Sequence, residues 1–223
     1  MNVLCVNGLR KRFVAHLQGG TTRTVLRGAD LALEAGTLTV LRGPSGSGKS
    51  SLLRCIYRTY RPDDGTVELD VGGRSVDLAV ASDATILDVR RNLLGMATQF
   101  LRVTPRVSAV DLVAEQGLDA ERAAALLREL GLAAELVHAP PATFSGGERQ
   151  LVNVAISIAR PRPLLLLDEA TASLDPQRRS RVLDVLAQRK QAGTTMLAVF
   201  HDLPQTPDLV DRVVHMRGGR VVA

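Results

Sequence analysis

The chain has 223 residues, of which 45% are hydrophobic and 23% are charged. This length allows one well-buried α/β domain with a helical insertion, and it is too short for two full domains. No apolar run approaches the roughly 18–20 residues that cross a bilayer, and the N-terminus lacks the basic and apolar regions of a signal peptide. We therefore expect a cytoplasmic protein without direct membrane insertion.

The formal net charge is +5 and the sequence pI is near 9.9. The arginines behind this charge are scattered, and only 3% of the residues are aromatic, so these features argue against a nucleic-acid partner. A mild positive field suits partner proteins and phosphate-rich ligands equally well. Cys5 and Cys55 are expected to be buried small hydrophobes rather than disulfide partners or metal ligands.

The first part of the chain predicts an antiparallel sheet. Residues 3–6 and 10–14 are expected to form two strands separated by a turn at Asn7-Gly8, and residues 25–26 and 29–34 form the next strands. Phe13 lies at the end of one of these strands. An aromatic residue there either stacks on an adenine ring or belongs to the core of the sheet, and the sequence leaves both interpretations open.

The stretch GPSGSGKS at 43–50 matches the phosphate-loop pattern G-x-x-x-x-G-K-[S/T] without a mismatch. An apolar run at 38–41 predicts a buried strand before it, and residues 51–56 predict a helix after it. The glycines allow successive backbone N–H groups to converge at the helix N-terminus, where an anion is favoured. Lys49 would reach the β- and γ-phosphates, and the Ser50 hydroxyl would bind Mg²⁺. The residues predicted to bind the nucleoside triphosphate here are Gly43, Pro44, Ser45, Gly46, Ser47, Gly48, Lys49, Ser50 and Ser51.

The middle of the chain predicts one hairpin and several helices. The expected elements are a hairpin at 66–71 and 75–78, a helix at 82–92 with Asp83 as a candidate cap, a strand at 94–98 that ends at Gln99, a helix capped by Ser108 that extends to Glu115, and a helix at 120–130 followed by Gly131. Residues from about 96 to 144 are therefore expected to be a helical insertion in an α/β core formed by 1–95 and 145–223.

Two further motifs predict chemistry. The sequence FSGGE at 144–148 stands directly before a helix expected at 149–159, and its glycines again favour a phosphate. The sequence LLLLDE at 164–169 predicts a strand buried on both faces, whose carboxyl end places two carboxylates at the edge of the sheet. Asp168 would bind Mg²⁺, and Glu169 would accept a proton from the attacking water.

The C-terminal part predicts a turn at 172–175 (ASLD), a helix at 177–191, a strand at 194–200 and a terminal hairpin around Gly218-Gly219. His201 follows the strand. Because the other strand ends form a nucleotide site, we expect His201 to contact the γ-phosphate.

Along essentially its whole length, the chain resembles the nucleotide-binding domain of an ABC ATPase. The resemblance is carried, in order, by the phosphate loop, Gln99, FSGGE, LLLLDE, ASLD and His201. It implies a P-loop, RecA-like, mostly parallel core with an N-terminal antiparallel β subdomain and a helical signature subdomain, and it implies Mg²⁺-dependent ATP hydrolysis.

The resemblance also implies roles for individual residues. Gln99 would touch Mg²⁺ or the attacking water, His201 would hold the γ-phosphate, and Asp175 would communicate across a dimer. The signature residues Ser145, Gly146, Gly147 and Glu148 would act on the ATP bound by the other protomer. One chain would then have to pair head-to-tail with a second copy or with a related ABC subunit.

Three positions depart from the family pattern. Leu151 and Ile156 stand where the family often has arginine, and Ala170 replaces the usual proline. None of them removes a phosphate or metal contact, so ATP binding should survive, although the turnover rate or the dimer packing would differ.

Within the family, residues 99–109 (QFLRVTPRVSA), together with FSGGERQ and VFHD, are most similar to PhnL-type ABC subunits of the carbon–phosphorus lyase system for phosphonate use. That resemblance implies partners that are soluble lyase subunits. The alternative is the ATPase subunit of an ABC membrane transporter of the lipoprotein-releasing or small-solute type. A third possibility, a nucleic-acid clamp, would need coiled-coil insertions or tandem domains, which this chain lacks.

Overall fold

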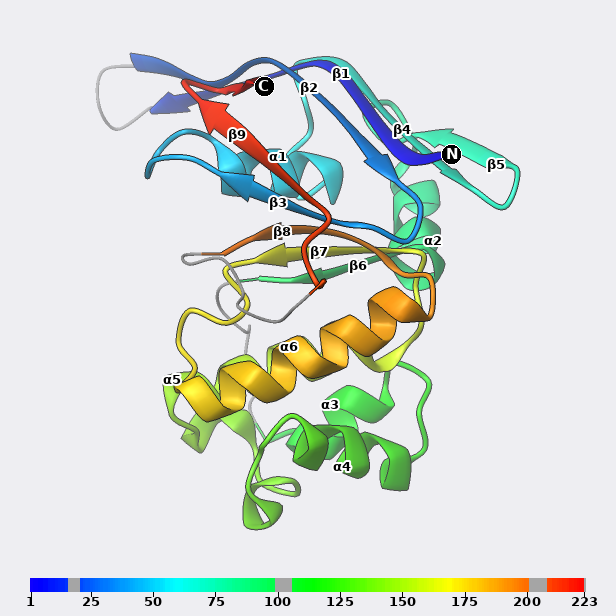
Figure 1. Ribbon diagram of the computed structural model, residues 1–223, viewed down its shortest axis with the longest axis vertical. Coiled ribbons are helices and arrows are strands. Elements are labelled where there is room, and N and C mark those ends of the chain that lie inside the picture. The colour runs from blue at the N-terminus through cyan, green and yellow to red at the C-terminus, as the bar shows by residue number, and fades with distance from the viewer. Residues whose placement is uncertain (16–20, 99–105, 201–207, 223) are drawn as a thin grey trace.

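The structure, a computed structural model, describes residues 1–15, 21–98, 106–200 and 208–222, and it contains two sheets (Figure 1). The antiparallel sheet has the order β2–β1–β4–β5, formed by β1 (Asn2–Ala15), β2 (Thr21–Glu34), β4 (Asp64–Val71) and β5 (Arg74–Asp77). The second sheet has the order β10–β9–β3–β8–β7–β6, formed by β3 (Leu38–Arg42), β6 (Leu94–Ala97), β7 (Leu164–Asp168), β8 (Thr195–Val199), β9 (Arg212–Arg217) and β10 (Arg220–Val222). All its pairings are parallel except that of β9 with β10.

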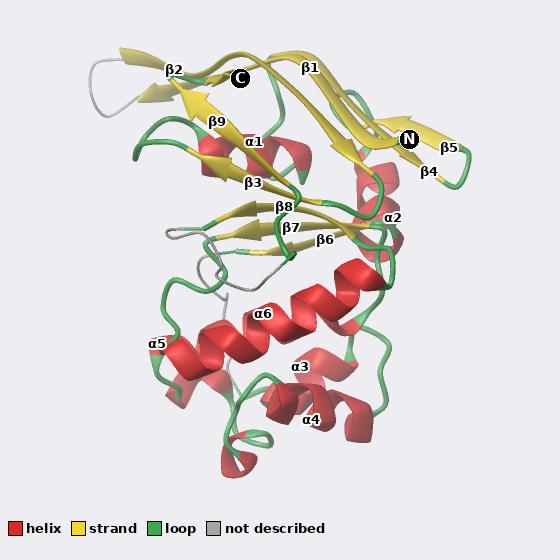
Figure 2. Cartoon of the chain, in the orientation of Figure 1, coloured by secondary structure: helices red, strands yellow, loops and turns green. Residues whose placement is uncertain are grey.

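The two sheets and the helices form layers (Figure 2). Helix α1 (Lys49–Ile56) lies between the sheets, and α2 (Asp83–Asn92) lies at one end of them. The parallel sheet carries the remaining helices on its other face: α3 (Ala109–Ala114), α4 (Ala120–Glu129), α5 (Gly146–Ala159) and α6 (Pro176–Gln191), with 3₁₀ turns at Ala134–Leu136 and Pro141–Thr143. Among the described residues, no helix has the length and apolar character that a membrane span requires.

Strands of the parallel sheet serve two hydrophobic cores at once. Along β7, Leu165 and Leu167 face the core shared with α3–α6, whereas Leu164 and Leu166 face the core between the two sheets. Successive side chains of a strand point to opposite faces, so an unbroken run of leucines fills both cores. This explains why the predicted doubly buried strand is found at this place in the sheet.

The N-terminal strands are longer than predicted. β1 and β2 each run for 14 residues without interruption, so the predicted turn at Asn7-Gly8 is wrong. The pairing of β1 with β2 shifts register between Val6 and Leu9, and Gly8 has a φ of 59°, which together describe a bulge. The Gly8 N–H donates to Asp30 Oδ1 over 2.7 Å, so the bulge leaves no unsatisfied donor at Gly8.

Helix boundaries follow the capping chemistry. Ser82, and not the predicted Asp83, caps α2, because its hydroxyl accepts a hydrogen bond from the Thr85 N–H. Ser108 caps α3 as predicted. Gly131 follows α4 with a φ of 97°, the left-handed conformation expected after a helix end.

Both cysteines are free thiols. Cys55 is buried on α1, and this burial raises the pKa of its thiol to about 12. Cys5 is only half-buried on β1, so it is more exposed than predicted.

The two-core arrangement predicts a large loss of stability when a central leucine is truncated. Leu166 is fully buried between Met96 of β6 and Leu197 of β8. We expect Leu166→Ala to lower the free energy of unfolding by about 2–5 kcal/mol. Leu87→Ala is the control, because Leu87 is 65% exposed on α2, and its effect should stay within about 0.5 kcal/mol. Urea denaturation measures the free energy of unfolding of both variants. Equal losses of this free energy in the two variants would contradict the two-core arrangement.

Candidate active site

The loop between β3 and α1 packs closely against neighbouring strands. Gly43 has a φ of 153°, and a Cβ atom there would lie 2.1 Å from the Met216 carbonyl oxygen. Gly48 has a φ of 109°, and a Cβ atom there would lie 2.8 Å from Met216 Cε and 2.9 Å from the Val25 carbonyl oxygen. Only glycine fits both positions. β2 and β9 therefore hold the back of the loop in place.

A cavity of about 350 Å³ opens at this loop. It is lined by Arg23, Val25, Ser45, Gly46, Gly48, Lys49, Ser50, Ser51 and Glu169. Lys49 Nζ donates to the carbonyl oxygens of Gly43, over 2.7 Å, and of Pro44, over 3.1 Å, so its ammonium group lies close to the loop backbone. Gly48 precedes α1 and has no side chain to cap its first amides. An ammonium group and the N-terminal end of a helix suit the phosphates of a nucleotide.

Ser50 and Asp168 lie together beside the cavity and fit a divalent cation. The Ser50 hydroxyl donates to Asp168 Oδ1 over 2.7 Å. Asp168 is buried, and its Oδ2 atom has no hydrogen-bond donor among the described residues. Arg54 Nη2 lies 3.8 Å from Oδ2. A buried carboxylate is costly without a cation, and hydroxyl and carboxylate oxygens are ligands that Mg²⁺ accepts. Mg²⁺ bound there would offset the negative charge of the phosphates.

Glu169 follows β7 in a conformation that few non-glycine residues adopt. Its φ is 53°, which costs roughly 1 kcal/mol or more. Its N–H donates to the Val199 carbonyl oxygen of β8 over 3.0 Å, so the neighbouring strand holds the backbone there. Glu169 lines the cavity, where a carboxylate can accept a proton from a water molecule.

The structure adds Arg23 to the predicted site and places Phe13 next to it. Arg23 lines the cavity and is paired with Phe13 in the register of β1 and β2, so both side chains share one face of the sheet. The Phe13 ring packs edge-to-face against Tyr60, with 5.0 Å between ring centroids. Arg23 belongs to no motif and could not be predicted; only the register of a long hairpin brings it to the phosphate loop.

The signature segment caps α5, which begins at Gly146 and therefore three residues before the predicted start. Ser145 Oγ accepts from the Glu148 N–H, and the Glu148 carboxylate accepts from the Ser145 hydroxyl, over 2.7 Å, and from the Ser145 N–H, over 2.8 Å. This is a capping box. These two hydrogen bonds from Ser145, together with the charge of Arg178, lower the pKa of Glu148 against the opposing effect of burial.

The signature segment is exposed and separate from the cavity. Ser145 and Gly146 are exposed, and no signature residue is among the described residues that line the cavity. Figure 1 shows that the start of α5 lies on the same side of the molecule as the loop before α1, at the left of the view. The structure therefore brings Lys49, Ser50, Asp168 and Glu169 together and leaves the signature segment outside that group.

Arg178 of α6 joins the signature segment to the ASLD turn. Its guanidinium lies 3.8 Å from Glu148 Oε1 and 3.5 Å from Asp175 Oδ2. Asp175 also caps α6, because its carboxylate accepts from the Arg178 N–H over 2.9 Å. A Cβ atom at Gly147 would lie 3.0 Å from the Ser173 carbonyl oxygen. These contacts hold the two motifs together within one chain.

Two predicted residues, Gln99 and His201, lie outside the described residues. The three departures from the family pattern are described, and they pack in the interior. Leu151 and Ala170 are fully buried, and Ile156 packs against the same core. Their apolar side chains suit the core that they occupy.

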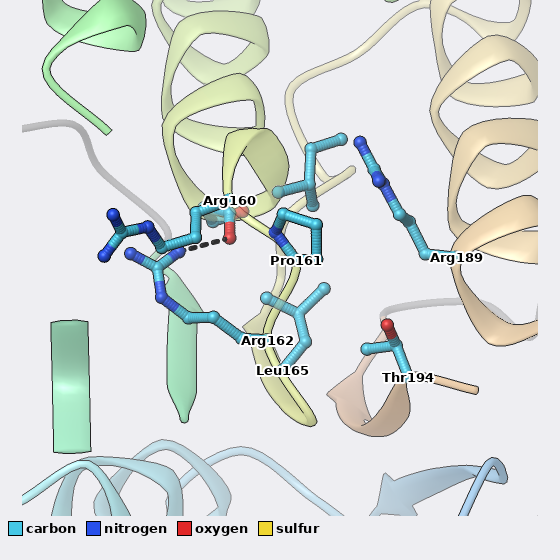
Figure 3. Close-up of a pocket in the computed structure, with 8 residues that line it drawn as sticks. Arg160, Pro161, Arg162, Leu165, Arg189 and Thr194 are labelled. Carbon is cyan, nitrogen blue, oxygen red and sulfur yellow. Dashed lines mark hydrogen bonds between the residues drawn. The ribbon is translucent and has the colours of Figure 1, made fainter. Parts of the chain in front are cut away.

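A second, much smaller cavity lies near the N-terminal ends of β7 and β8 (Figure 3). Its volume of about 10 Å³ holds no more than a water molecule. Arg160 and Arg162 at its wall serve the structure, because they donate to carbonyl oxygens at the end of α2, those of Arg90 and Arg91. Arg162 also donates to the Ser157 carbonyl oxygen over 3.2 Å (Figure 3). We assign no ligand to this cavity.

Comparison with known proteins identifies the family. Residues 26–172 match the ABC transporter family, and this chain belongs to it. It is accordingly an ATPase that uses ATP with Mg²⁺. The lipoprotein-releasing system ATP-binding protein LolD of Anaeromyxobacter dehalogenans is 36% identical over 98% of this chain and 92% of its own length. A probable amino-acid ABC transporter ATP-binding protein of Haemophilus influenzae is 33% identical over 100% of this chain and 87% of its own length.

The fold matches two solved structures of the ATP-binding cassette MJ0796. Their TM-scores are 0.86 and 0.84 at 23% and 22% identity, and each match covers 99% of this chain and 97% of the other. One structure is a dimer, and the other is a dimeric post-hydrolysis state with ADP and Pi bound. The predicted ABC ATPase fold is confirmed.

The position of Lys49 predicts a specific binding defect. We expect Lys49→Ala to weaken Mg²⁺-ATP binding about 10- to 100-fold, because a hydrogen bond to a charged group contributes about 1.5–3 kcal/mol. Lys190→Ala is the control, since the Lys190 ammonium instead binds Asp211, over 2.7 Å. Titration calorimetry measures both affinities. An unchanged affinity in Lys49→Ala would remove this lysine from the nucleotide site.

Proposed function

We propose that this chain is the ATPase subunit of an ABC membrane transporter. The cavity at the phosphate loop, which Lys49, Ser50 and Glu169 line and Asp168 adjoins, carries the ATPase part of this proposal, and the relatives carry the transporter part. The relatives reported above supply the second support, because they are named as transporter ATP-binding proteins and align with nearly all of this chain.

Within this proposal, each site residue has a role in ATP hydrolysis. The loop residues and Lys49 hold the phosphates, Ser50 and Asp168 hold Mg²⁺, and Glu169 takes a proton from the attacking water. Gln99 and His201 complete the site as metal or water ligand and as γ-phosphate contact, and Phe13 stacks on the adenine. The face that Phe13 shares with Arg23 supports its role.

A head-to-tail pair of subunits follows from the separation of the motifs. The exposed signature segment lies outside the cavity of its own chain, so it is available to the ATP of a second protomer. Arg178 would then couple this segment to Asp175, at the turn that faces the dimer partner. The dimeric MJ0796 structures support such a pair. The partner is a second copy or a related ABC subunit.

We also propose that the chain is divided into an ATP-binding core and a helical subdomain. We place the helical subdomain at about 96–144, between the core segments 1–95 and 145–223. Helices α3 and α4 fall inside this subdomain, and both pack on α5 at the start of the second core segment, so α5 joins the subdomain to the core. In a transporter this subdomain would face the membrane-spanning partner.

Two classes of transported substrate fit the relatives. LolD of Ruegeria sp. is 38% identical over 98% of this chain and belongs to a lipoprotein-releasing system. The Haemophilus relative is assigned to an amino-acid transporter. The subunit binds ATP rather than the transported molecule, so the permease would determine which class applies.

A second candidate is the ABC subunit of the carbon–phosphorus lyase system. It rests on the similarity of residues 99–109 to PhnL-type subunits, and residues 99–105 of that segment lie outside the described residues. The relatives reported above give it no support, and they favour the transporter. The two candidates share the ATPase and differ in their partners.

Glu169→Gln tests the catalytic assignment and the pair together. We expect it to keep Mg²⁺-ATP binding and to lose at least about 100-fold in hydrolysis, since general-base catalysis contributes about 10²–10⁴-fold. With Mg²⁺-ATP the variant should elute at twice the monomer mass, and with ADP as a monomer. Turnover equal to that of the parent would remove Glu169 as the base, and a monomer with ATP bound would contradict the homodimer.

The partner decides between the two candidates. We would purify tagged Glu169→Gln with Mg²⁺-ATP from the natural host, grown with a phosphonate as the sole phosphorus source, and identify stoichiometric partners by mass spectrometry. A polytopic membrane protein that stimulates the parent ATPase after reconstitution is the expected result. Soluble lyase subunits with a second ABC subunit would instead establish the second candidate. Lys49→Ala is the control, because ATP-dependent partners should be lost from it.

A further inference from the structure

Two buried amide side chains of α5 bind the segments next to two catalytic residues. Gln150 and Asn153 are 3% and 6% exposed. Gln150 Nε2 donates to the carbonyl oxygens of Thr98, over 3.1 Å, and of Ala170, over 3.0 Å. Asn153 Nδ2 also donates to the Thr98 carbonyl oxygen and lies 3.4 Å from Gln150 Oε1. We call these two side chains and two carbonyl groups the amide clamp.

The positions of the two carbonyl groups give the amide clamp its significance. Thr98 directly precedes Gln99 in the chain, and Ala170 directly follows Glu169. A displacement of the Ala170 carbonyl group changes the backbone from which the Glu169 side chain projects, and the Thr98 carbonyl group anchors the same two amides at the end of β6. Gln150 binds both carbonyl groups with one NH₂ group, so it fixes them relative to each other and to α5.

The helix α5 links the signature segment to the parallel sheet. Ser145 caps it five residues before Gln150, a distance of about 7.5 Å along a helix. At the other end, a Cβ atom on Gly95 of β6 would lie 3.0 Å from the Ser157 carbonyl oxygen, so the helix and the strand are in close contact. A shift of the signature segment therefore moves the clamp side chains with it.

We propose that Gln150 and Asn153 are positioning residues that make the alignment of Glu169 depend on the placement of the signature helix. The physical reason is the free-energy cost of leaving a buried amide or carbonyl group without a hydrogen-bond partner. The helix and the two catalytic segments consequently move as one unit. In a head-to-tail pair, contact of Ser145 with one ATP would thereby set the geometry around the other. The proposal rests on the catalytic role given above for Glu169.

Kinetics of the full chain test the amide clamp. Gln150→Met keeps the length of the side chain without its donors, and Asn153→Ala removes one donor while favouring the helix. We expect kcat for ATP hydrolysis to fall about 10- to 100-fold in each variant, with KM within about two-fold of the parent, because small misplacements of catalytic groups cost rates of this order. Both side chains donate to the Thr98 carbonyl oxygen. We therefore expect the fold loss of kcat in the double variant to be smaller than the two single-variant fold losses multiplied together.

Ser157→Ala is the matched control. Ser157 is buried on the same helix, and its hydroxyl donates to the Val154 carbonyl oxygen within α5. This variant should lower the melting temperature without changing kcat. Three results would overturn the proposal. Ser157→Ala could lose as much kcat as the clamp variants, or KM could rise in the clamp variants as far as kcat falls. The third is a kcat within about two-fold of the parent in both clamp variants.

Glu169→Gln distinguishes a failure of the amide clamp from a failure of the catalytic assignment of Glu169. If this variant is inactive and the clamp variants turn over normally, only the amide clamp is wrong. If this variant turns over like the parent, the catalytic assignment on which the clamp rests is wrong as well.

Discussion

The parallel strands β3, β7 and β8 must bury side chains on both faces, and this constraint places the chemistry of the molecule. Each strand contributes alternate residues to the two hydrophobic cores, so polar groups have no room along the strands and gather at their carboxyl ends. Asp168 ends β7, the phosphate loop follows β3, and β8 holds the backbone of Glu169 through Val199. The cations and carboxylates of the site are thus brought together by strands that carry almost no polar residues themselves.

The antiparallel sheet and the C-terminal hairpin make this edge rigid. The Gly219 N–H donates to the Ser47 carbonyl oxygen over 2.9 Å, and the Arg27 N–H donates to the Gly219 carbonyl oxygen over 2.8 Å. The turn before β10 therefore bridges the phosphate loop and β2. A loop held from behind keeps its amides in place before a ligand arrives, which lowers the cost of ordering it on binding.

Segments whose chemistry requires certain residue types at fixed spacing could be predicted from the sequence. The phosphate loop, the strand before Asp168 and the cap at Ser108 belong to this class, because each is determined by neighbours along the chain. Features that depend on long-range pairing could not be predicted. Asn7-Gly8 has the composition of a turn, yet the pairing of both flanking segments with β2 makes it a bulge. Arg23 reaches the site only through that same register, and the amide clamp exists only because α5 packs along β6.

In the proposed head-to-tail pair, the amide clamp would connect the two ATP sites in which one chain takes part. Ser145 and Glu148 lie at the exposed start of α5, whereas Gln150 reaches the backbone beside Glu169 in the interior. A signal between two sites requires an element whose placement affects both, and a single helix with a capping box at one end and buried amides further along it has this property. Arg178 provides a parallel connection at the surface, from Glu148 to Asp175. The buried connection is the stiffer one, because its donors have no water to replace the carbonyl groups that they would lose.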